Sequence, residues 1–320
     1  MPLPIYFAPL EGVTDAEYRR VHSAHFTGVA KYFIPFISPT QNLVLTNRER
    51  FDVSPANNAG MIAVPQILTK NPEHFLWAAN QLMDMGYQEV NINLGCPSGT
   101  VTGKGKGSGL LIRPDDLERF LDEVYAKTPV KVSLKTRIGF SSPEEFPELA
   151  EIFERYPVHE LIVHPRTRSE FYKGTPHRDV YRDVLSGTHL PLVYNGDLFT
   201  AQECRAFEAE YPCCALMLGR GLLANPALAR EYAGGSAITA EEIHSFVRDT
   251  MAAYQTRHPQ NVVLGRMREV LKNVICCFES PDKVRKAVRK ANCVQDIEDA
   301  AAMLCSQYAL RENPGFVPER

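Results

Sequence analysis

The stretch Glu89-Val90-Asn91-Ile92-Asn93-Leu94-Gly95-Cys96-Pro97-Ser98 decides how the fold of this chain is interpreted. Residues 89–94 alternate as a β-strand does, and Gly95 and Pro97 then end the strand abruptly. Cys96 therefore stands at the carboxyl end of a strand, on the loop that leaves it. The following residues 99–109 are rich in glycine and lysine, and we expect them to form a mobile loop over the cysteine.

Cys96 has two interpretations in this setting. A cysteine held at a strand end beneath a mobile loop is placed as a reacting group under a lid. A free thiol is also often an inert, buried packing residue. The other motifs of the chain decide between these alternatives.

Eight short apolar runs recur along the chain, and most are followed by a helical pattern. The runs lie at residues 5–8, 29–33, 61–66, 90–93, 130–135, 161–164, 192–195 and 215–218, and helical spacing recurs at 72–85, 114–126, 144–156 and 200–211. Strands that alternate with helices predict an α/β fold, and eight of them predict a closed (β/α)8 TIM barrel. An open doubly wound sheet is the structural competitor. No G-x-G-x-x-G motif follows the first run, which disfavours a dinucleotide-binding sheet.

The pattern changes after Gly234-Gly235-Ser236, and no strand signal returns. Thr239-Ala240-Glu241-Glu242 is a capping box that predicts the start of a helix. Further helical patterns cover residues 266–278, 282–290 and 294–308. We therefore expect two domains, a barrel over residues 1–235 and a small all-helical domain over residues 236–320.

Composition limits the class of protein. The chain has 320 residues, of which 44% are hydrophobic and 23% charged, with a net charge of -3, as in an ordinary globular protein. None of the eight cysteines shows the C-x-x-C spacing of a zinc site, so we expect no metal. No secretory signal and no run of membrane-spanning length stands out, so we expect a cytoplasmic monomer without a membrane partner.

Polar residues and glycines end the predicted strands, at the rim where barrel enzymes carry their chemistry. Gln66 and Asn93 offer hydrogen bonds to the edge of a flat heterocycle, and Lys135 offers a positive charge. Asn195-Gly196-Asp197 and Gly219-Arg220-Gly221 follow the seventh and eighth strands, the usual phosphate-binding position of such barrels. Together these residues favour a flat, phosphorylated ligand.

Each of these residues alone has a simpler interpretation. Lys135 alone fits a solvated charge, and His164 fits a core histidine with satisfied hydrogen bonds. Asn195-Gly196-Asp197 alone is an ordinary turn. Their occurrence at the ends of neighbouring strands favours the functional interpretation.

The motifs also resemble those of a known family, the tRNA-dihydrouridine synthases of the bacterial, FMN-dependent type. The resemblance is carried by Ala8-Pro9-Leu10-Glu11-Gly12-Val13-Thr14-Asp15, Asn93-Leu94-Gly95-Cys96-Pro97, His164-Pro165-Arg166-Thr167-Arg168, Asn195-Gly196-Asp197 and Gly219-Arg220-Gly221, in the order and spacing of the family. Leu10 stands where the family often has methionine, and Pro165 stands where glycine is common.

The resemblance implies a function and a set of roles. The family binds FMN in its barrel, uses NADPH (or NADH) as electron donor, and reduces the C5–C6 bond of particular tRNA uridines. Cys96 then corresponds to the catalytic proton donor to C5, and Asn93 to the asparagine near the target base. The residues that correspond to FMN contacts are Pro9, Leu10, Glu11, Gln66, Lys135, His164, Asn195, Gly196, Asp197, Gly219 and Arg220.

Basic residues provide candidate tRNA contacts. Residues 282–290 contain five basic side chains and one acidic side chain on a predicted helix, and we expect Arg285, Lys286 and Arg289 to contact tRNA. A second basic group contains Arg257, Arg266, Arg268 and Lys272. Near the barrel rim, the candidate tRNA contacts are Lys104, Lys106, Arg166 and Arg168. A solvated helix face is the alternative meaning of such charge runs.

Two other functions remain open at this point. One is an FMN-dependent barrel oxidoreductase that acts on a free pyrimidine or another small molecule, which has no need of a basic helical tail. The other is a tRNA-binding protein without catalysis, which has no need of Cys96 and Lys135. The sequence does not identify which uridine is modified.

Overall fold

The protein, represented by a computed structural model that describes residues 2–211 and 213–317, contains a closed barrel of eight strands in the order β1 to β8. Neighbouring strands pair in parallel. The strands are β1 (Ile5–Phe7), β2 (Val29–Ile37), β3 (Ala63–Ile67), β4 (Glu89–Leu94), β5 (Lys131–Arg137), β6 (Leu161–His164), β7 (Leu192–Tyr194) and β8 (Ala215–Leu218). The prediction of a (β/α)8 barrel and of its eight strands is confirmed.

The strand β4 shows why both faces of the sheet are buried. Val90, Ile92 and Leu94 alternate with Asn91 and Asn93, and all five side chains are buried. Helices cover a parallel barrel on the outside, and side chains fill its inside. The apolar and amide side chains of β4 therefore lie on two opposite faces of the strand, and both faces are buried. The asparagines on one face are therefore buried polar groups that need hydrogen-bond partners.

The register of β4, β5 and β6 sets which rim residues are neighbours. Asn93 on β4 pairs with Lys135 on β5, and Arg137 on β5 pairs with His164 on β6. Parallel pairing brings the carboxyl ends of these strands to the same edge of the sheet. The strand ends therefore bring Asn93, Lys135, Arg137 and His164 side by side.

The chain divides into two compact units. Unit 1 contains Met1–Tyr32, Asp197–Glu210 and Leu218–Arg320, and unit 2 contains Phe33–Gly196 and Tyr211–Met217. Unit 1 thus combines the helical C-terminal residues with β1 and the start of β2. The division of the chain into domains 1–235 and 236–320 stays a prediction.

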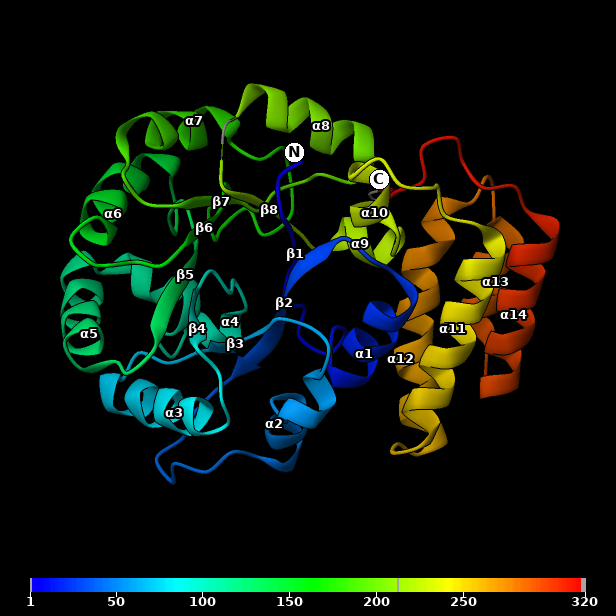
Figure 1. Ribbon diagram of the computed structural model, residues 1–320, viewed down its shortest axis with the longest axis horizontal. Coiled ribbons are helices and arrows are strands. Elements are labelled where there is room, and N and C mark those ends of the chain that lie inside the picture. The colour runs from blue at the N-terminus through cyan, green and yellow to red at the C-terminus, as the bar shows by residue number, and fades with distance from the viewer. Residues whose placement is uncertain (1, 212, 318–320) are drawn as a thin grey trace. The chain divides into compact units, whose positions relative to one another are not determined.

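Unit 2 places its helices along the outside of its strands, as α3, α5 and α6 show in Figure 1. Phe75 of α3 meets Phe120 of α5 edge to face, with ring centroids 6.3 Å apart. The helical patterns at 72–85, 114–126 and 144–156 are confirmed. The helices are α2 (Asn47–Asp52), η1 (Pro55–Asn58), α3 (Pro72–Asp84), α4 (Gly99–Thr102), η2 (Gly107–Ile112), α5 (Pro114–Lys127), η3 (Pro143–Glu145), α6 (Phe146–Phe153) and α7 (Arg178–Gly187).

Unit 1 contains the predicted C-terminal helices, which lie side by side in Figure 1. The capping box is confirmed, because the Glu242 N–H donates to Thr239 Oγ1 and the Thr239 N–H donates to Glu242 Oε2. The helices are α1 (Ala16–His25), α8 (Ala201–Glu210), α9 (Arg220–Ala224), α10 (Leu228–Tyr232), α11 (Ala240–Gln255), α12 (Gln260–Val274), η4 (Ile275–Cys277), α13 (Asp282–Lys290) and α14 (Val294–Gln307). None of the described helices is long and apolar enough to cross a membrane.

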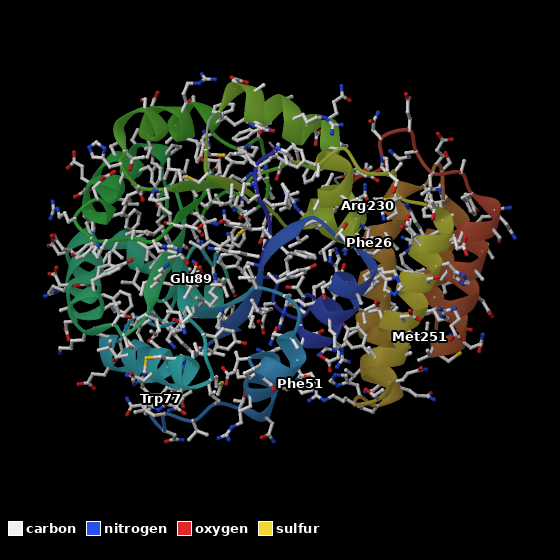
Figure 2. All side chains as sticks on the ribbon, viewed as in Figure 1. Phe26, Phe51, Trp77, Glu89, Arg230 and Met251 are labelled. Carbon is white, nitrogen blue, oxygen red and sulfur yellow. The ribbon has the colours of Figure 1, made fainter. Side chains whose placement is uncertain are left out.

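An aromatic cluster joins α1 to α11 in unit 1. The ring of Phe246 lies 5.5 Å from Tyr18 and 5.4 Å from Phe26, the latter labelled in Figure 2. His22 is buried in the same cluster, and burial lowers its pKa to about 3. This histidine is therefore a neutral core residue rather than a functional one.

Candidate active site

Cys96 lies half-buried on the turn after β4, and its sulfur is not part of a disulfide. The Asn93 side chain holds this turn, since its Oδ1 accepts the backbone N–H of Gly95 at 3.1 Å and that of Cys96 at 2.9 Å. Cys204 and Cys277 are by contrast buried. Cys96 is thus fixed through its backbone while its side chain stays partly accessible.

The segment after Cys96 packs on it as two short helices. In η2, Ser108 Oγ donates to the Cys96 carbonyl oxygen at 2.8 Å. Gly107 has φ +57°, and a Cβ there would lie 3.0 Å from that oxygen, so a larger side chain does not fit. The expectation of a loop without regular structure is wrong for residues 99–102 and 107–112, which are helical.

Lys135 projects from β5 beside Asn93 and is half-buried. Removal from water lowers the pKa of its ammonium group to about 7, the nearby Arg137 guanidinium contributes to this lowering, and the Cys96 side chain opposes these effects. Near neutral pH, the fraction of Lys135 that is charged therefore depends on the pH and on the charge of any ligand beside it. An anionic ligand next to Lys135 would favour the charged form.

Arg137 is a buried cation that the sequence interpretation did not include among the site residues. Its Nε donates to the Gly95 carbonyl oxygen at 2.9 Å, and its Nη1 donates to the carbonyl oxygens of Thr167 at 2.7 Å and Phe171 at 2.8 Å. The guanidinium also lies 5.5 Å from the ring centroid of Tyr172. Arg137 therefore ties the Cys96 turn to the loop after β6.

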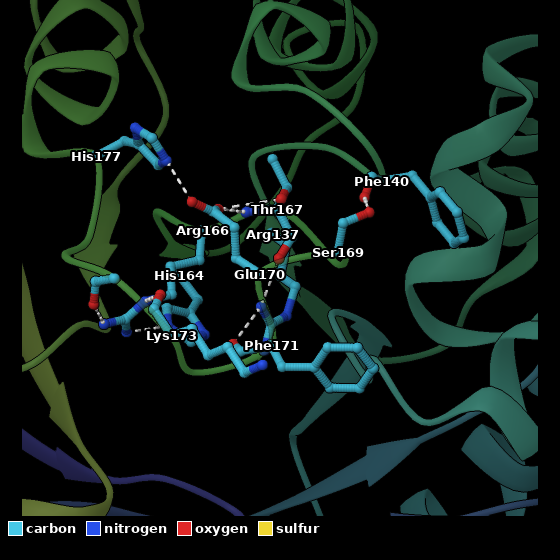
Figure 3. Close-up of polar contacts among 11 residues, drawn as sticks. Arg137, Phe140, His164, Arg166, Thr167, Ser169, Glu170, Phe171, Lys173 and His177 are labelled. Atoms are coloured by element: carbon cyan, nitrogen blue, oxygen red, sulfur yellow. Dashed lines mark hydrogen bonds and ion pairs between the residues drawn. The ribbon is translucent and has the colours of Figure 1, made fainter. Parts of the chain in front are cut away.

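The loop after β6 is held by a second buried arginine (Figure 3). Arg166 donates from Nε to the Lys173 carbonyl oxygen at 3.1 Å and from Nη2 to that of Gly174 at 2.6 Å. Its Nη1 lies 3.3 Å from His164 Nε2. A guanidinium only donates, so the His164 ring accepts at Nε2 and carries its proton on Nδ1.

Glu170 and Arg168 complete this loop. Glu170 accepts the Thr167 N–H at 2.6 Å and pairs with His177 at 2.7 Å (Figure 3). Burial raises the pKa of Glu170, but these hydrogen bonds outweigh burial and lower it overall. Arg168 donates from Nε to the Pro97 carbonyl oxygen at 3.1 Å, next to Cys96 in the chain. The predicted tRNA contacts Arg166 and Arg168 thus also hold the loops around Cys96.

Gln66 and Asn93 are both buried, and Asn93 Nδ2 donates to Gln66 Oε1 at 2.7 Å. On the loop after β7, Asn195 Nδ2 donates to the Met217 carbonyl oxygen at 2.7 Å. At Gly196 a Cβ would lie 2.1 Å from the Tyr194 hydroxyl, so only glycine fits. Unit 2 therefore holds Cys96, Gln66, Asn93, Lys135, His164, Asn195 and Gly196 among the predicted site residues.

Unit 1 holds the remaining predicted FMN contacts, Pro9, Leu10, Glu11, Asp197, Gly219 and Arg220. Arg220 donates to Asp197 Oδ1 at 2.6 Å, and its guanidinium lies 5.3 Å from the Phe199 ring and 5.0 Å from the Phe316 ring. At Gly219 the nearest atom to an added Cβ would be 3.6 Å away, on Ala8. The arginine is thus held in place, and a Cβ at Gly219 would make ordinary van der Waals contacts.

A cavity of about 670 Å³ lies between α3, α5 and the segment after Cys96. Its lining includes Lys70, Lys104, Arg113 and Arg119, together with Asp116 and Glu123. The predicted tRNA contact Lys104 belongs to this cluster. Lys106 donates to Ser38 Oγ at 3.1 Å, and its pKa is lowered by burial and by the charges of Lys104 and Lys70. The three lysines therefore form one cationic group in unit 2.

The basic helix α13 covers Asp282–Lys290 as predicted. Lys286 and Arg289 are exposed and Arg285 is half-buried, while Val284 and Val288 are buried beneath them. Cationic side chains therefore lie on the solvent face of the helix.

The second predicted basic group does not form a free cationic surface in unit 1. Arg257 pairs with Glu17 at 2.7 Å, and Arg266 pairs with Asp15. Arg268 donates to the Ala291 carbonyl oxygen. These three arginines stabilise the packing around α1, α12 and the end of α13, and a tRNA contact from this group stays a prediction.

Comparisons with known proteins agree on one family. The family model described as "Dihydrouridine synthase (Dus)" matches residues 6–309. The tRNA-dihydrouridine synthase B of Pasteurella multocida is 31% identical over 227 residues, which covers 71% of this chain and 68% of that protein. The tRNA-dihydrouridine synthase B of Vibrio vulnificus is 29% identical over 265 residues, which covers 82% of this chain and 78% of that protein.

Solved structures share the barrel fold at low sequence identity. An old yellow enzyme homologue from Zymomonas mobilis matches with a TM-score of 0.56 at 14% identity, covering 74% of this chain and 92% of that chain. A mutant morphinone reductase in complex with tetrahydroNAD matches with a TM-score of 0.53 at 14% identity, covering 73% of this chain and 87% of that chain. The predicted resemblance is confirmed, and the chain belongs to the dihydrouridine synthase family, a family of oxidoreductases.

Proposed function

We propose that this protein reduces specific uridines of tRNA to dihydrouridine, with bound FMN and with NADPH as electron donor. The observation that carries the proposal is the placement of Cys96. Its half-buried thiol lies at the carboxyl end of β4, on a turn fixed by Asn93 and Arg137 and beside Lys135. A thiol placed in this way suits a proton donor better than a packing residue.

The donor set fits FMN. Gln66 carries an amide N–H group, and Lys135 carries a charge that an anion beside it would stabilise, while Asn93 lies near the target base in the proposal. Gly219 has no side chain to hinder close approach of a phosphate, and Arg220 is held by Asp197 at 2.6 Å as a cation of fixed position. In the proposal these residues other than Asn93 hold the cofactor together with Pro9, Leu10, Glu11, His164, Asn195 and Gly196.

The chain itself supplies positioning and one proton. Bound flavin supplies hydride chemistry at C6 of the uracil. The Cys96 thiol then donates a proton to C5, so the base gains one hydride and one proton across the C5–C6 bond. Arg137 and Asn93 hold the turn so that the thiol points at the same place in each turnover.

The substrate proposal is tRNA rather than a free pyrimidine. Exposed Lys286 and Arg289 on α13 and the Lys70, Lys104 and Lys106 group in unit 2 suit phosphate groups. The relatives named above are tRNA-dihydrouridine synthases. We further propose that the protein acts in the cytoplasm as a monomer and that its target uridine leaves the RNA stack to reach Cys96.

The test combines colour, activity and mapping. The purified protein should be yellow, oxidise NADPH, and form dihydrouridine in whole tRNA but not in free uridine. Mapping of dihydrouridine in tRNA from cells that lack the protein should then reveal the missing position. A colourless protein that does not take up FMN, or activity on free uridine that equals activity on tRNA, would contradict the proposal.

A further inference from the structure

Five side chains in unit 2 form a continuous hydrogen-bond chain that leads to the turn of Cys96. The chain begins at Glu89, which is labelled in Figure 2, at the start of β4. Gln66, Asn91 and Ser133 are each at most 1% exposed and Asn93 is 8% exposed. In order along the chain, the residues are Glu89, Ser133, Asn91, Gln66 and Asn93.

The direction of the chain is fixed at its Cys96 end. The backbone N–H groups of Gly95 and Cys96 can only donate, so Asn93 must turn Oδ1 toward them, at 3.1 and 2.9 Å. The Asn93 amide nitrogen therefore faces Gln66 and donates to its Oε1 at 2.7 Å. This contact leaves the Gln66 nitrogen to face Asn91.

The remaining hydrogen bonds keep this direction to the far end at Glu89. Gln66 Nε2 donates to Asn91 Oδ1 at 2.7 Å, and Asn91 Nδ2 donates to Ser133 Oγ at 3.0 Å. The Ser133 hydroxyl then donates to Glu89 Oε1 at 2.8 Å, and a carboxylate is an acceptor only. Every donor in the chain thus points away from Cys96 and toward Glu89.

The ordered chain limits what Asn93 can offer to a ligand. Both lone pairs of its oxygen are used by two backbone N–H groups, and one of its N–H bonds is used by Gln66. One N–H remains, so Asn93 can address only an acceptor atom. In the proposed function Cys96 donates to C5, so the substituent on the adjoining C4 is the one that comes near Asn93. This substituent is a carbonyl acceptor in uracil and an amino donor in cytosine.

We propose that Asn91 and Ser133 are positioning residues that keep the Gln66 oxygen facing the Asn93 N–H group, so that Asn93 stays in place as a donor, and that this donor selects uracil over cytosine at the target position. The inference rests on the proposed function, in which Asn93 lies near the target base. The Asn93 N–H group and the cytosine amino group are both donors, so neither would have a hydrogen-bond partner. This loss should weaken binding of a cytidine substrate by roughly tenfold or more.

Asn93→Asp is the most direct test, because it should reverse the donor-to-acceptor direction of the hydrogen bonds from Asn93 to Ser133. An aspartate still accepts from Gly95 and Cys96, but it offers Gln66 an oxygen instead of an N–H. Gln66 and Asn91 can then each turn their amides over, and the Ser133 hydroxyl can donate to Asn91. The variant presents an acceptor to the base, so its preference should shift from uridine toward cytidine.

The measurement is the Kd of the FMN-loaded protein for two tRNA transcripts, which carry uridine or cytidine at the mapped target position. Wild type should prefer uridine about tenfold or more, and Asn93→Asp should lose or invert this preference. Asn91→Leu and Ser133→Ala should reduce it to less than about threefold, because Gln66 can then turn its amide nitrogen toward Asn93 and displace the donor. Asn91→Asp should retain it, since a carboxylate still accepts from Gln66.

Thr136→Val is the matched control, because Thr136 is equally buried on β5 and donates to the Arg137 carbonyl oxygen rather than into the chain of amides. Its preference for uridine should equal that of wild type.

If Ser133→Ala and Asn91→Leu keep the wild-type preference while Tm and flavin content match the control, the inference is wrong. Should Asn91→Leu fail to fold, Ser133→Ala, which removes one oxygen atom, decides alone. Absence of dihydrouridine formation by wild type would instead contradict the proposed function.

Discussion

The Arg137 Nε–H group donates to the carbonyl oxygen of Gly95 over 2.9 Å, directly before the cysteine in the chain. The same guanidinium donates to Thr167 and Phe171 on the loop after β6. One buried cation therefore fixes two loops at the rim of the barrel. The position of the Cys96 thiol depends on a side chain that need not touch the substrate.

Arg137→Lys should separate this positioning role from the charge. Lysine keeps the charge but cannot reach three carbonyl oxygens in a planar fork, so buried acceptors lose their partners. We expect a loss of roughly 1–3 kcal/mol in the free energy of unfolding and a fall in kcat of about tenfold or more. Arg113→Lys, at an exposed position, is the control for both measurements. An unchanged kcat in a variant of lowered Tm would limit Arg137 to a structural role.

Cys96→Ala should leave flavin content and NADPH oxidation near wild type and lower dihydrouridine formation by roughly 10²–10⁴-fold. The physical reason is loss of the proton donor to C5, while the turn keeps its backbone bonds to Asn93. Single-turnover formation of dihydrouridine in tRNA measures the effect. Cys214→Ala removes an exposed thiol of the same unit and should be neutral. A wild-type rate for Cys96→Ala would exclude the cysteine as the donor.

The barrel was predictable because its strands are short apolar runs of a kind that parallel barrels require. The sequence does not show which residues of each strand point into the barrel. Asn91 lies between Val90 and Ile92, and the alternation does not reveal which face points inward when all three are buried. The hydrogen-bond chain therefore has no signature in the sequence of one strand, since its members come from β3, β4 and β5.

The segment after Cys96 shows a different limit. Its glycines predict a flexible loop, yet Gly107 is required because a side chain there would collide with the Cys96 backbone. Arg166 and Arg137 show a third limit. Arg137 ends β5 and Arg166 follows β6, but only three-dimensional packing decides that their N–H groups are used by backbone oxygens.

Lys135 gives a prediction for pH dependence. Its pKa of about 7, lowered by burial and by Arg137, means that the ammonium group loses its proton as the pH of the unliganded protein rises above 7. If FMN binding requires the charged form, binding must take up a proton above that pH. The Kd of the apoprotein for FMN should therefore rise by up to about tenfold per pH unit between roughly pH 7 and 9.

Titration of the apoprotein by flavin fluorescence at several pH values measures this effect. Lys135→Met should bind FMN more weakly at neutral pH and with a flatter pH dependence. Lys131→Met, an exposed position at the other end of β5, should behave as wild type. The same slope in wild type and Lys135→Met would assign the dependence to another group.

The exposed face of α13 should carry a large share of the salt dependence of tRNA binding. Changing Lys283, Lys286, Arg289 and Lys290 to Gln removes charges from solvent-exposed positions and leaves Val284 and Val288 buried. Each phosphate contact that is lost should lower the slope of log K against log salt by roughly 0.7–0.9. NADPH oxidation without tRNA should be unaffected, because these residues take no part in the flavin site.

The control for α13 is a double change, Lys127→Gln with Lys131→Gln, which removes exposed charges from α5 and the start of β5. It should leave the salt slope at its wild-type value, because the amino ends of barrel strands lie away from the catalytic rim. Equal slopes for wild type and the α13 variant would mean that the helix is only a solvated face. The phosphate contacts would then have to come from the Lys70, Lys104 and Lys106 group, and Lys104→Gln with Lys106→Gln should lower the slope instead.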